Sequence, residues 1–194
     1  MDIISGTSKH VRIALIVASV RTPRLADVLL LWLREQLADI AWLELDVIDL
    51  ADVDLDLRGT RAGGSDSPIS KQLDLADGYL VLTPEYNHSF PAALKNAIDW
   101  HFEEWQYKPV SFVGYGAGSG GLRAIEQLRL IFPELRATTT RNAVALTAPW
   151  ERITADGTYD ATEGSVAALH ATLAELHWWA LALRDGRRVH AVPA

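Results

Sequence analysis

Short apolar runs alternate along this chain with longer segments in which apolar residues recur every three or four positions. Runs of four to eight apolar residues are typical of strands buried on both faces, and the 3.6-residue period is typical of amphipathic helices. The predicted strands are 11–18, 42–50, 78–82, 108–115 and 136–146. The predicted helices are 24–38, 70–76, 91–105, 122–132 and 162–184, with Gly186 ending the last one.

This regular alternation predicts an α/β fold, with a parallel sheet covered by helices on both faces. Five strands suggest the flavodoxin-like order 2-1-3-4-5, a three-layer sandwich that holds ligands at the carboxyl edge between strands 1 and 3. The 194 residues contain no repeat or linker, so we predict a single domain over 1–194 with loose termini at 1–10 and 187–194. The polar loop 52–70 is long enough to be functional or mobile.

Composition excludes several classes of function. The net charge of −7 argues against a nucleic-acid partner. The absence of cysteine excludes disulfides, thiolate metal sites and a cysteine nucleophile, and no other ligand cluster indicates a metal. Charged residues precede a first apolar run that is too short to cross a bilayer, so we expect neither a signal peptide nor a membrane partner. A cytoplasmic location fits these features.

The loops after strands 1, 3 and 4 meet at one edge of the predicted sheet, and all three have unusual composition. In the first, Ser19 and Thr22 offer hydroxyls, while Arg21 and Arg24 offer guanidinium groups. With the positive N-terminus of the next helix, these groups suit a phosphate. Two solvated arginines at a helix start are the other interpretation. Neither a G-x-G-x-x-G nor a Walker pattern is present.

The loop after the third strand, 83–91, contains two prolines that restrict its backbone. Glu85, Tyr86 and Asn87 offer backbone amides and an aromatic face, which a planar heterocycle requires. Glu85 and His88 could instead form an acid–base pair, or His88 could lie at a solvent-exposed rim.

The loop after the fourth strand, 116–121, has four glycines in six residues. Glycine lets a backbone approach a flat ligand closely and present its N–H groups. A flexible turn between strand and helix is the other interpretation.

Together these motifs resemble the NADPH-dependent FMN reductase family, over about 13–132. The motifs are Ala18-Ser-x-Arg-x-x-Arg24, Pro84-Glu-Tyr-Asn followed by Leu94-Lys-Asn-Ala-Ile-Asp-Trp, and Tyr115-Gly-x-x-Ser-Gly-Gly. That family belongs to the flavodoxin-like superfamily and includes quinone, azo-dye and chromate reductases. This chain departs from the family pattern at Ala18, where glycine is usual, and at Thr22-Pro23, where Pro23 lacks one N–H that could reach a phosphate.

The resemblance implies an FMN cofactor, reduced by NADPH or NADH, and a small-molecule acceptor such as a quinone, an azo compound or a free flavin. It implies that three residues bind the FMN phosphate: Ser19, Arg21 and Arg24. Four would line the isoalloxazine ring: Pro84, Glu85, Tyr86 and Asn87. Four more would cover its pyrimidine edge: Gly116, Ala117, Gly118 and Ser119. No catalytic protein acid or base is expected, because the flavin performs the chemistry.

Two other functions remain open from the sequence. One is a flavin-binding electron carrier or redox sensor without NAD(P)H turnover, and the other is a module for a phosphate-bearing ligand other than flavin. The resemblance also implies a homodimer, or a dimer of dimers, packed through the helix 91–105. That helix carries an apolar stripe of Leu94, Ala97, Ile98 and Trp105, with Trp100 and Phe102 off it. Arg58 and Arg61 could contact the NADPH phosphate, the partner chain or only solvent.

Overall fold

The strands form one parallel sheet in the predicted order. The computed structural model describes residues 10–58 and 67–192, so Arg61 and most of the predicted N-terminal arm lie outside the described residues. The strands are β1 Val11–Val17, β2 Leu43–Asp49, β3 Gly78–Pro84, β4 Pro109–Gly116, β5 Thr138–Thr139 and β6 Val144–Thr147. Their order is β2-β1-β3-β4-β5, with β6 also paired to β4, and every pairing is parallel. The flavodoxin-like order is therefore confirmed.

The predicted fifth strand, 136–146, is wrong as a single element. It is divided into β5 and β6, which pair with the start and the end of β4 respectively. Between them, the backbone N–H groups of Arg141 and Asn142 donate to the Glu175 carboxylate instead of to β4. The Thr140 hydroxyl bonds to Ser111 at 2.7 Å. These side-chain contacts replace the ladder hydrogen bonds and interrupt the strand.

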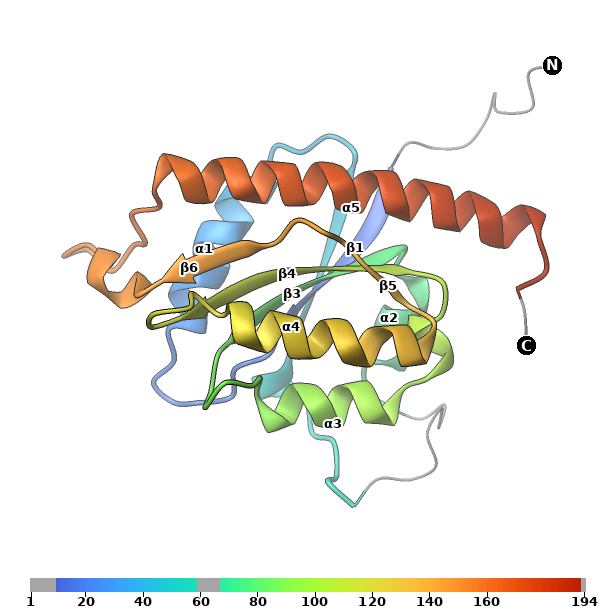
Figure 1. Cartoon of the computed structure of the whole chain (residues 1–194), viewed down its shortest axis with the longest axis horizontal. Coiled ribbons are helices and arrows are strands. Elements are labelled where there is room, and N and C mark those ends of the chain that lie inside the picture. The colour runs from blue at the N-terminus through green and yellow to red at the C-terminus, as the bar shows by residue number, and fades with distance from the viewer. Residues whose placement is uncertain (1–9, 59–66, 193–194) are drawn as a thin grey trace.

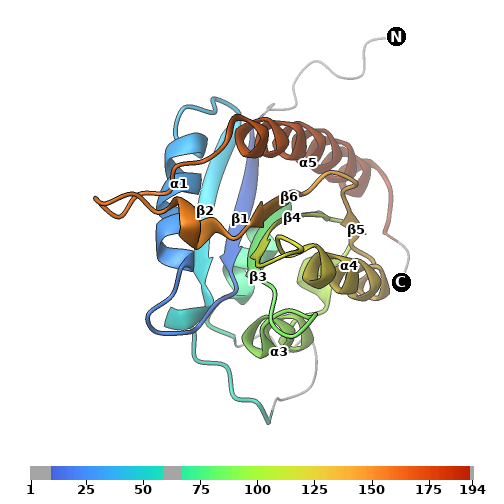
Figure 2. The same cartoon turned by 60° about the vertical axis from the view of Figure 1, so that its left-hand side comes forward.

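Helices cover both faces of the sheet (Figures 1 and 2). The five are α1 Ala26–Leu37, α2 Ser70–Leu75, α3 Ala92–Trp100, α4 Leu122–Ile131 and α5 Glu163–Val189. Buried residues of α1 and α5 form one core with the sheet, and those of α2, α3 and α4 form a second core on the opposite face. The arrangement is the three-layer sandwich predicted from the alternation of strands and helices.

Two predicted helix ends are wrong. The helix 91–105 ends at Trp100, and Trp105 lies in a separate 3₁₀ turn, where it is fully buried. The last helix does not end at Gly186 but continues to Val189, so 187–189 are not part of a loose terminus. Arg187 explains the extension, because its guanidinium donates to the Tyr107 carbonyl and holds the last turn against the body of the protein.

The helix α5 is long and apolar enough to cross a membrane by length and composition alone. Its stripe of Leu169, Leu173, Leu176 and Ala180 is buried against the sheet. One face of α5 therefore packs in the core, whereas residues on its other face, such as Trp178, are exposed.

The register of the sheet brings the three unusual loops to one edge. Val17 pairs with Leu82, and Pro84 pairs with Tyr115, so the loops after β1, β3 and β4 start side by side. Backbone hydrogen bonds tie the loop starts together: Ala18 N–H donates to the Leu82 carbonyl at 2.9 Å, and Glu85 N–H donates to the Tyr115 carbonyl at 2.8 Å. The candidate ligand loops are therefore adjacent, as the sequence predicts.

Candidate functional site

Three residues join the loop after β1 (loop 1) to the loop after β3 (loop 3). The Ser19 hydroxyl lies 3.2 Å from the Tyr86 hydroxyl. The Arg21 guanidinium lies over the Tyr86 ring, 3.7 Å from its centroid, which is a cation–π contact. Arg21 is otherwise exposed. A cation and two hydroxyls predicted from two separate motifs therefore meet at one place.

The backbone of loop 1 has the character of an anion site. Within the described ranges, no hydrogen-bond partner is found for the backbone N–H groups of Ser19, Val20, Arg21 and Thr22. Ser19 is only 1% exposed, and a buried N–H without a partner is rare in folded proteins. Successive unpaired N–H groups beside an arginine are a favourable site for a phosphate.

Arg24, by contrast, is largely occupied. Its Nε donates to Asp27 at 2.8 Å, its Nη1 donates to the Ser19 carbonyl at 2.7 Å and to Asp49 at 2.6 Å, and its Nη2 also donates to Asp49. These contacts use four of the five N–H groups of a guanidinium. The interpretation of Arg24 as a solvated residue is therefore wrong, although one of its N–H groups has no partner among the described residues.

Sequence reasoning missed Asp49, the last residue of β2. The hydrogen bonds that Arg24 donates to the Asp49 carboxylate raise the pKa of Arg24. Burial alone would raise the pKa of Asp49, but the hydrogen bonds from Arg24 and from the Ala51 N–H, together with the Arg24 charge, lower it below its usual value. The sequence did contain a signal for Asp49. It is an aspartate at the carboxyl end of the predicted second strand, which lies beside loop 1 in the predicted strand order.

Loop 3 ends in a tight two-residue turn. Asn87 and His88 have φ angles of 50° and 66°, in the left-handed region that non-glycine residues seldom adopt. The flanking Tyr86 and Ser89 exchange two backbone hydrogen bonds of 2.8 and 2.9 Å. Gln127 of α4 donates to the His88 carbonyl at 2.7 Å and accepts from the Ser89 hydroxyl at 2.6 Å. Two successive residues with positive φ are what a two-residue hairpin turn requires, and Gln127 holds this turn against α4.

Glu85 links loop 3 to the loop after β4 (loop 4). Its carboxylate is 8% exposed, accepts hydrogen bonds from the Ser119 hydroxyl and the Arg123 backbone N–H, and lies 3.2 Å from the Arg123 guanidinium. Burial would raise the pKa of Glu85, but these hydrogen bonds and the Arg123 charge lower it, so the group is ionised at neutral pH. Among the described residues, the Glu85 side chain bonds to Ser119 and Arg123. It does not bond to His88, which is exposed at the turn.

The glycine positions of loop 4 differ in what they require. Gly121 has a φ of +90°, and a Cβ there would lie 2.4 Å from the Tyr115 nitrogen, so only glycine fits. Gly118 faces open space. Ala117 and Gly118 are exposed, and their backbone N–H groups have no hydrogen-bond partner in the part of the chain that the structure describes. Loop 4 therefore presents free N–H groups at its tip from a fixed base.

The predicted site residues thus divide into two groups. The backbone N–H groups of Glu85 and Tyr86 are already used, by the Tyr115 and Ser89 carbonyls. The Ser119 hydroxyl is used by Glu85. Among the described residues, the predicted site groups that remain open are the N–H groups of loop 1, of Asn87 and of the loop 4 tip, together with the Arg21 guanidinium. A flat ligand that bears a phosphate fits this set, because it needs an anion site at one end and backbone donors at the other.

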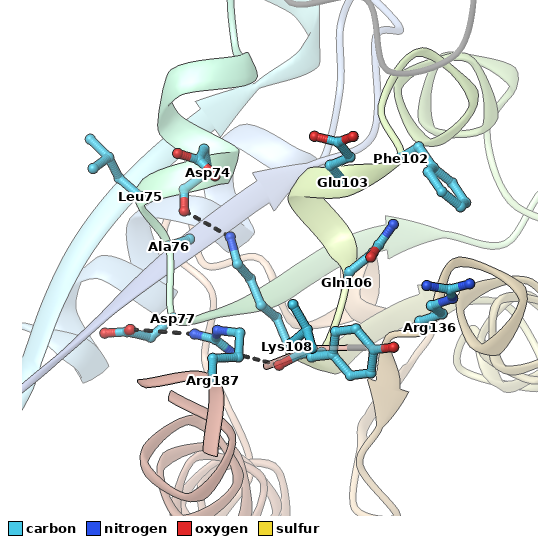
Figure 3. Close-up of a pocket in the computed structure, with 12 residues that line it drawn as sticks. Asp74, Leu75, Ala76, Asp77, Phe102, Glu103, Gln106, Lys108, Arg136 and Arg187 are labelled. Atoms are coloured by element: carbon cyan, nitrogen blue, oxygen red, sulfur yellow. Dashed lines mark hydrogen bonds and ion pairs between the residues drawn. The ribbon is translucent and has the colours of Figure 1, made fainter. Parts of the chain in front are cut away.

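Of the cavities in the described part of the chain, one borders loop 1 and another is remote from all three loops. One, of about 400 Å³, is lined mainly by apolar residues from loop 1, the segment after β2 and the start of α3, among them Val20, Leu50 and Ala92. The other, of about 570 Å³, lies at the opposite edge of the sheet (Figure 3).

Lys108 in the second cavity donates to the carbonyls of Leu73 and Asp74 at the end of α2, a favourable place for a cation. Burial, with the charge of Arg187, lowers the pKa of Lys108 to about 8. Its ammonium group therefore completes a helix end, and Arg187 likewise caps the Tyr107 carbonyl.

Comparison with known proteins identifies a family and several relatives of this chain. The profile of the NADPH-dependent FMN reductase family matches residues 11–151. An NAD(P)H-dependent FMN reductase of Schizosaccharomyces pombe is 31% identical over 158 residues, which cover 73% of this chain and 76% of that protein. An NADPH:quinone oxidoreductase of Arabidopsis thaliana is 36% identical over 95 residues, about half of each chain (47% and 48%).

Solved structures agree in fold. FerB from Paracoccus denitrificans, a flavoenzyme NAD(P)H:(acceptor) oxidoreductase, superposes with a TM-score of 0.67 at 23% identity, over 87% of this chain and 97% of FerB.

Proposed function

Because this chain belongs to the NADPH-dependent FMN reductase family, we propose that it binds FMN across loops 1, 3 and 4 and passes hydride from NAD(P)H to a small-molecule acceptor. The observation that carries the binding site is the run of N–H groups from Ser19 to Thr22, which have no partner among the described residues, beside Arg21. Bound FMN supplies the redox chemistry, since the flavin accepts a hydride and gives it up again.

Loop 1 holds the phosphate in this proposal. The N–H groups of the loop, the Ser19 hydroxyl and the Arg21 guanidinium supply donors and positive charge. Arg24 adds its one remaining N–H. The missing N–H of Pro23 costs little, because four unpaired N–H groups precede it.

Loops 3 and 4 hold the ring system. Tyr86 forms an aromatic wall, and Pro84 and Asn87 fix the path of the chain on either side of it. On the other side, Gly116 allows the close approach of loops 3 and 4, because a Cβ there would lie 3.2 Å from the Glu85 Cβ. The N–H groups of Ala117 and Gly118 would stabilise negative charge that develops on the pyrimidine edge when the ring is reduced. Glu85 and Ser119 act by joining the two loops.

The acceptor and the partner chain are proposed to lie near opposite ends of α3. Relatives include an NAD(P)H:quinone oxidoreductase of Solanum tuberosum and a 2-hydroxy-1,4-benzoquinone reductase of a Burkholderia species, so we propose a quinone-like acceptor. The apolar cavity beside Val20 would contact such a flat molecule. Leu94, Ala97 and Ile98 of α3 face the sheet, whereas Phe102 just beyond α3 is 37% exposed. A second copy packed against the side that carries Phe102 would form the homodimer. We also propose that the enzyme is cytoplasmic.

The test is flavin binding followed by anaerobic reduction. We expect the flavin-free protein to quench FMN fluorescence on titration, and the loaded protein to lose its flavin absorbance rapidly when mixed with NADPH or NADH in a stopped-flow instrument. Addition of a benzoquinone should restore the absorbance. Failure to bind FMN would overturn the proposal. Binding without reduction by either nicotinamide would instead assign an electron carrier.

A further inference from the structure

Asp49 and Arg24 form the most complete side-chain pair near loop 1. Both side chains are 13% exposed, and both Nη atoms of Arg24 bond to the Asp49 carboxylate. The same carboxylate accepts the Ala51 N–H at 3.0 Å, which fixes it at the end of β2. Each side chain of this bidentate ion pair is also held by a further hydrogen bond, so the pair is restricted to one geometry.

Arg24 transmits that geometry to the backbone of loop 1. Its Nη1 holds the Ser19 carbonyl at 2.7 Å. In a trans peptide the C=O of Ser19 and the N–H of Val20 lie in one plane and point in opposite directions. Holding the carbonyl toward Arg24 therefore turns the Val20 N–H away from it, to the side of the loop where a ligand can bind.

We propose that Asp49 is a positioning residue for the phosphate site: it fixes Arg24 as a brace that orients the Ser19–Val20 peptide, and Arg21 with the loop N–H groups binds the phosphate. This inference rests on the proposed binding of FMN. In this proposal Arg24 mainly fixes the conformation of loop 1 and contacts the ligand only secondarily.

The sign of one substitution distinguishes the brace from simple electrostatics. A carboxylate near a phosphate dianion repels it, so charge alone predicts that Asp49→Asn tightens FMN binding. A brace predicts the opposite, because the asparagine side chain offers one acceptor oxygen and loses the bidentate, charge-assisted contact. Charged hydrogen bonds of this kind are strong enough for us to expect about tenfold weaker FMN binding.

The experiment titrates flavin-free protein with FMN and with riboflavin, which lacks the phosphate, following flavin fluorescence. For Asp49→Asn we expect the affinity for FMN to fall about tenfold and the affinity for riboflavin to change less than about twofold. In Asp49→Glu the affinity for FMN should recover in part. The matched control is Asp46→Asn on the same strand, whose carboxylate bonds to Gln72 at 3.0 Å. It should leave both affinities unchanged.

A second variant tests the pair from the other side. Arg24→Lys keeps the charge but loses the planar fork, so a brace predicts weakening similar to that of Arg24→Gln. If Arg24 instead acted as a charge on the phosphate, the lysine variant would retain most of the affinity. The brace is overturned by unchanged or tighter FMN binding in Asp49→Asn, or by equal losses for FMN and riboflavin. Failure of the unaltered protein to bind FMN would overturn the proposed function as well.

Discussion

Replacing Glu85 with glutamine tests whether the link between loops 3 and 4 stabilises the fold. The carboxylate accepts hydrogen bonds from Ser119 and from the Arg123 N–H and forms an ion pair with the Arg123 guanidinium. Hydrogen bonds to charged groups contribute roughly 1.5–3 kcal/mol each, and glutamine can keep one of the two in weakened form. The Arg123 side chain is 47% exposed, so the ion pair itself adds at most about 1 kcal/mol.

We therefore expect Glu85→Gln to lower the free energy of unfolding by about 1–2 kcal/mol at pH 7. In a chain of this length that corresponds to a fall in Tm of roughly 2–8 °C. The assay is thermal and urea unfolding of the flavin-free protein, followed by circular dichroism. Glu126→Gln is the matched control, because that side chain is 72% exposed and, among the described residues, pairs with Arg129 alone, so its substitution should have little effect.

The pH dependence gives a second check. Glu85 has a lowered pKa in the folded state, so its contribution is fully present above the unfolded value of about 4.3 and is lost as pH falls through the folded pKa. The difference between the unaltered protein and Glu85→Gln should be constant from neutral pH down to about pH 5 and shrink below about pH 4. Equal stability at pH 7, or a difference that persists undiminished in acid, would refute the role of the ionised carboxylate.

The same structure supports three further predictions. Gly121→Ala forces a Cβ into the Tyr115 backbone at a positive φ and should cost more than about 2 kcal/mol in urea unfolding, whereas Gly118→Ala should stay within about 0.5 kcal/mol. Lys108 has a pKa lowered to about 8, so unfolding free energy should rise with pH from there to about 10.4, and Lys108→Met should lack that rise. FMN at a hundredfold excess over its Kd should stabilise the protein by about 2.7 kcal/mol, and an absent shift in Tm would contradict binding.

The fold followed from the sequence wherever the core alone determines structure. The buried runs of β1, β3 and β4 have one stable arrangement, a parallel sheet covered on both faces, and their loops follow from that order. The errors fell where a single distant contact decides the outcome. Glu175 of α5 captures the backbone of 141–142 and divides the last strand, and Arg187 extends α5 past a glycine. A local pattern carries no information on such partners.

The candidate site shows the same limit of local patterns: the sequence predicts the types of residue in the site but not the contacts that they make. The motifs predicted which loops meet, and the type of ligand that their groups suit. They did not show that Arg24 bonds to Asp49, 25 positions away, or that Glu85 bonds to Ser119, 34 positions away. In both cases the charged residue of a motif is occupied by another part of the protein.

There is a physical reason why the charged residues of these loops bond to the protein. A loop that leaves its N–H groups unpaired for a ligand cannot use them to fix its own conformation, so other groups must do so. In loop 1 the Arg24 guanidinium holds the Ser19 carbonyl, and between loops 3 and 4 the Glu85 carboxylate holds the start of α4. Strong, directional contacts from side chains thus keep the backbone donors free and correctly oriented. The cost of an unpaired amide in the free protein is then recovered when a ligand binds there.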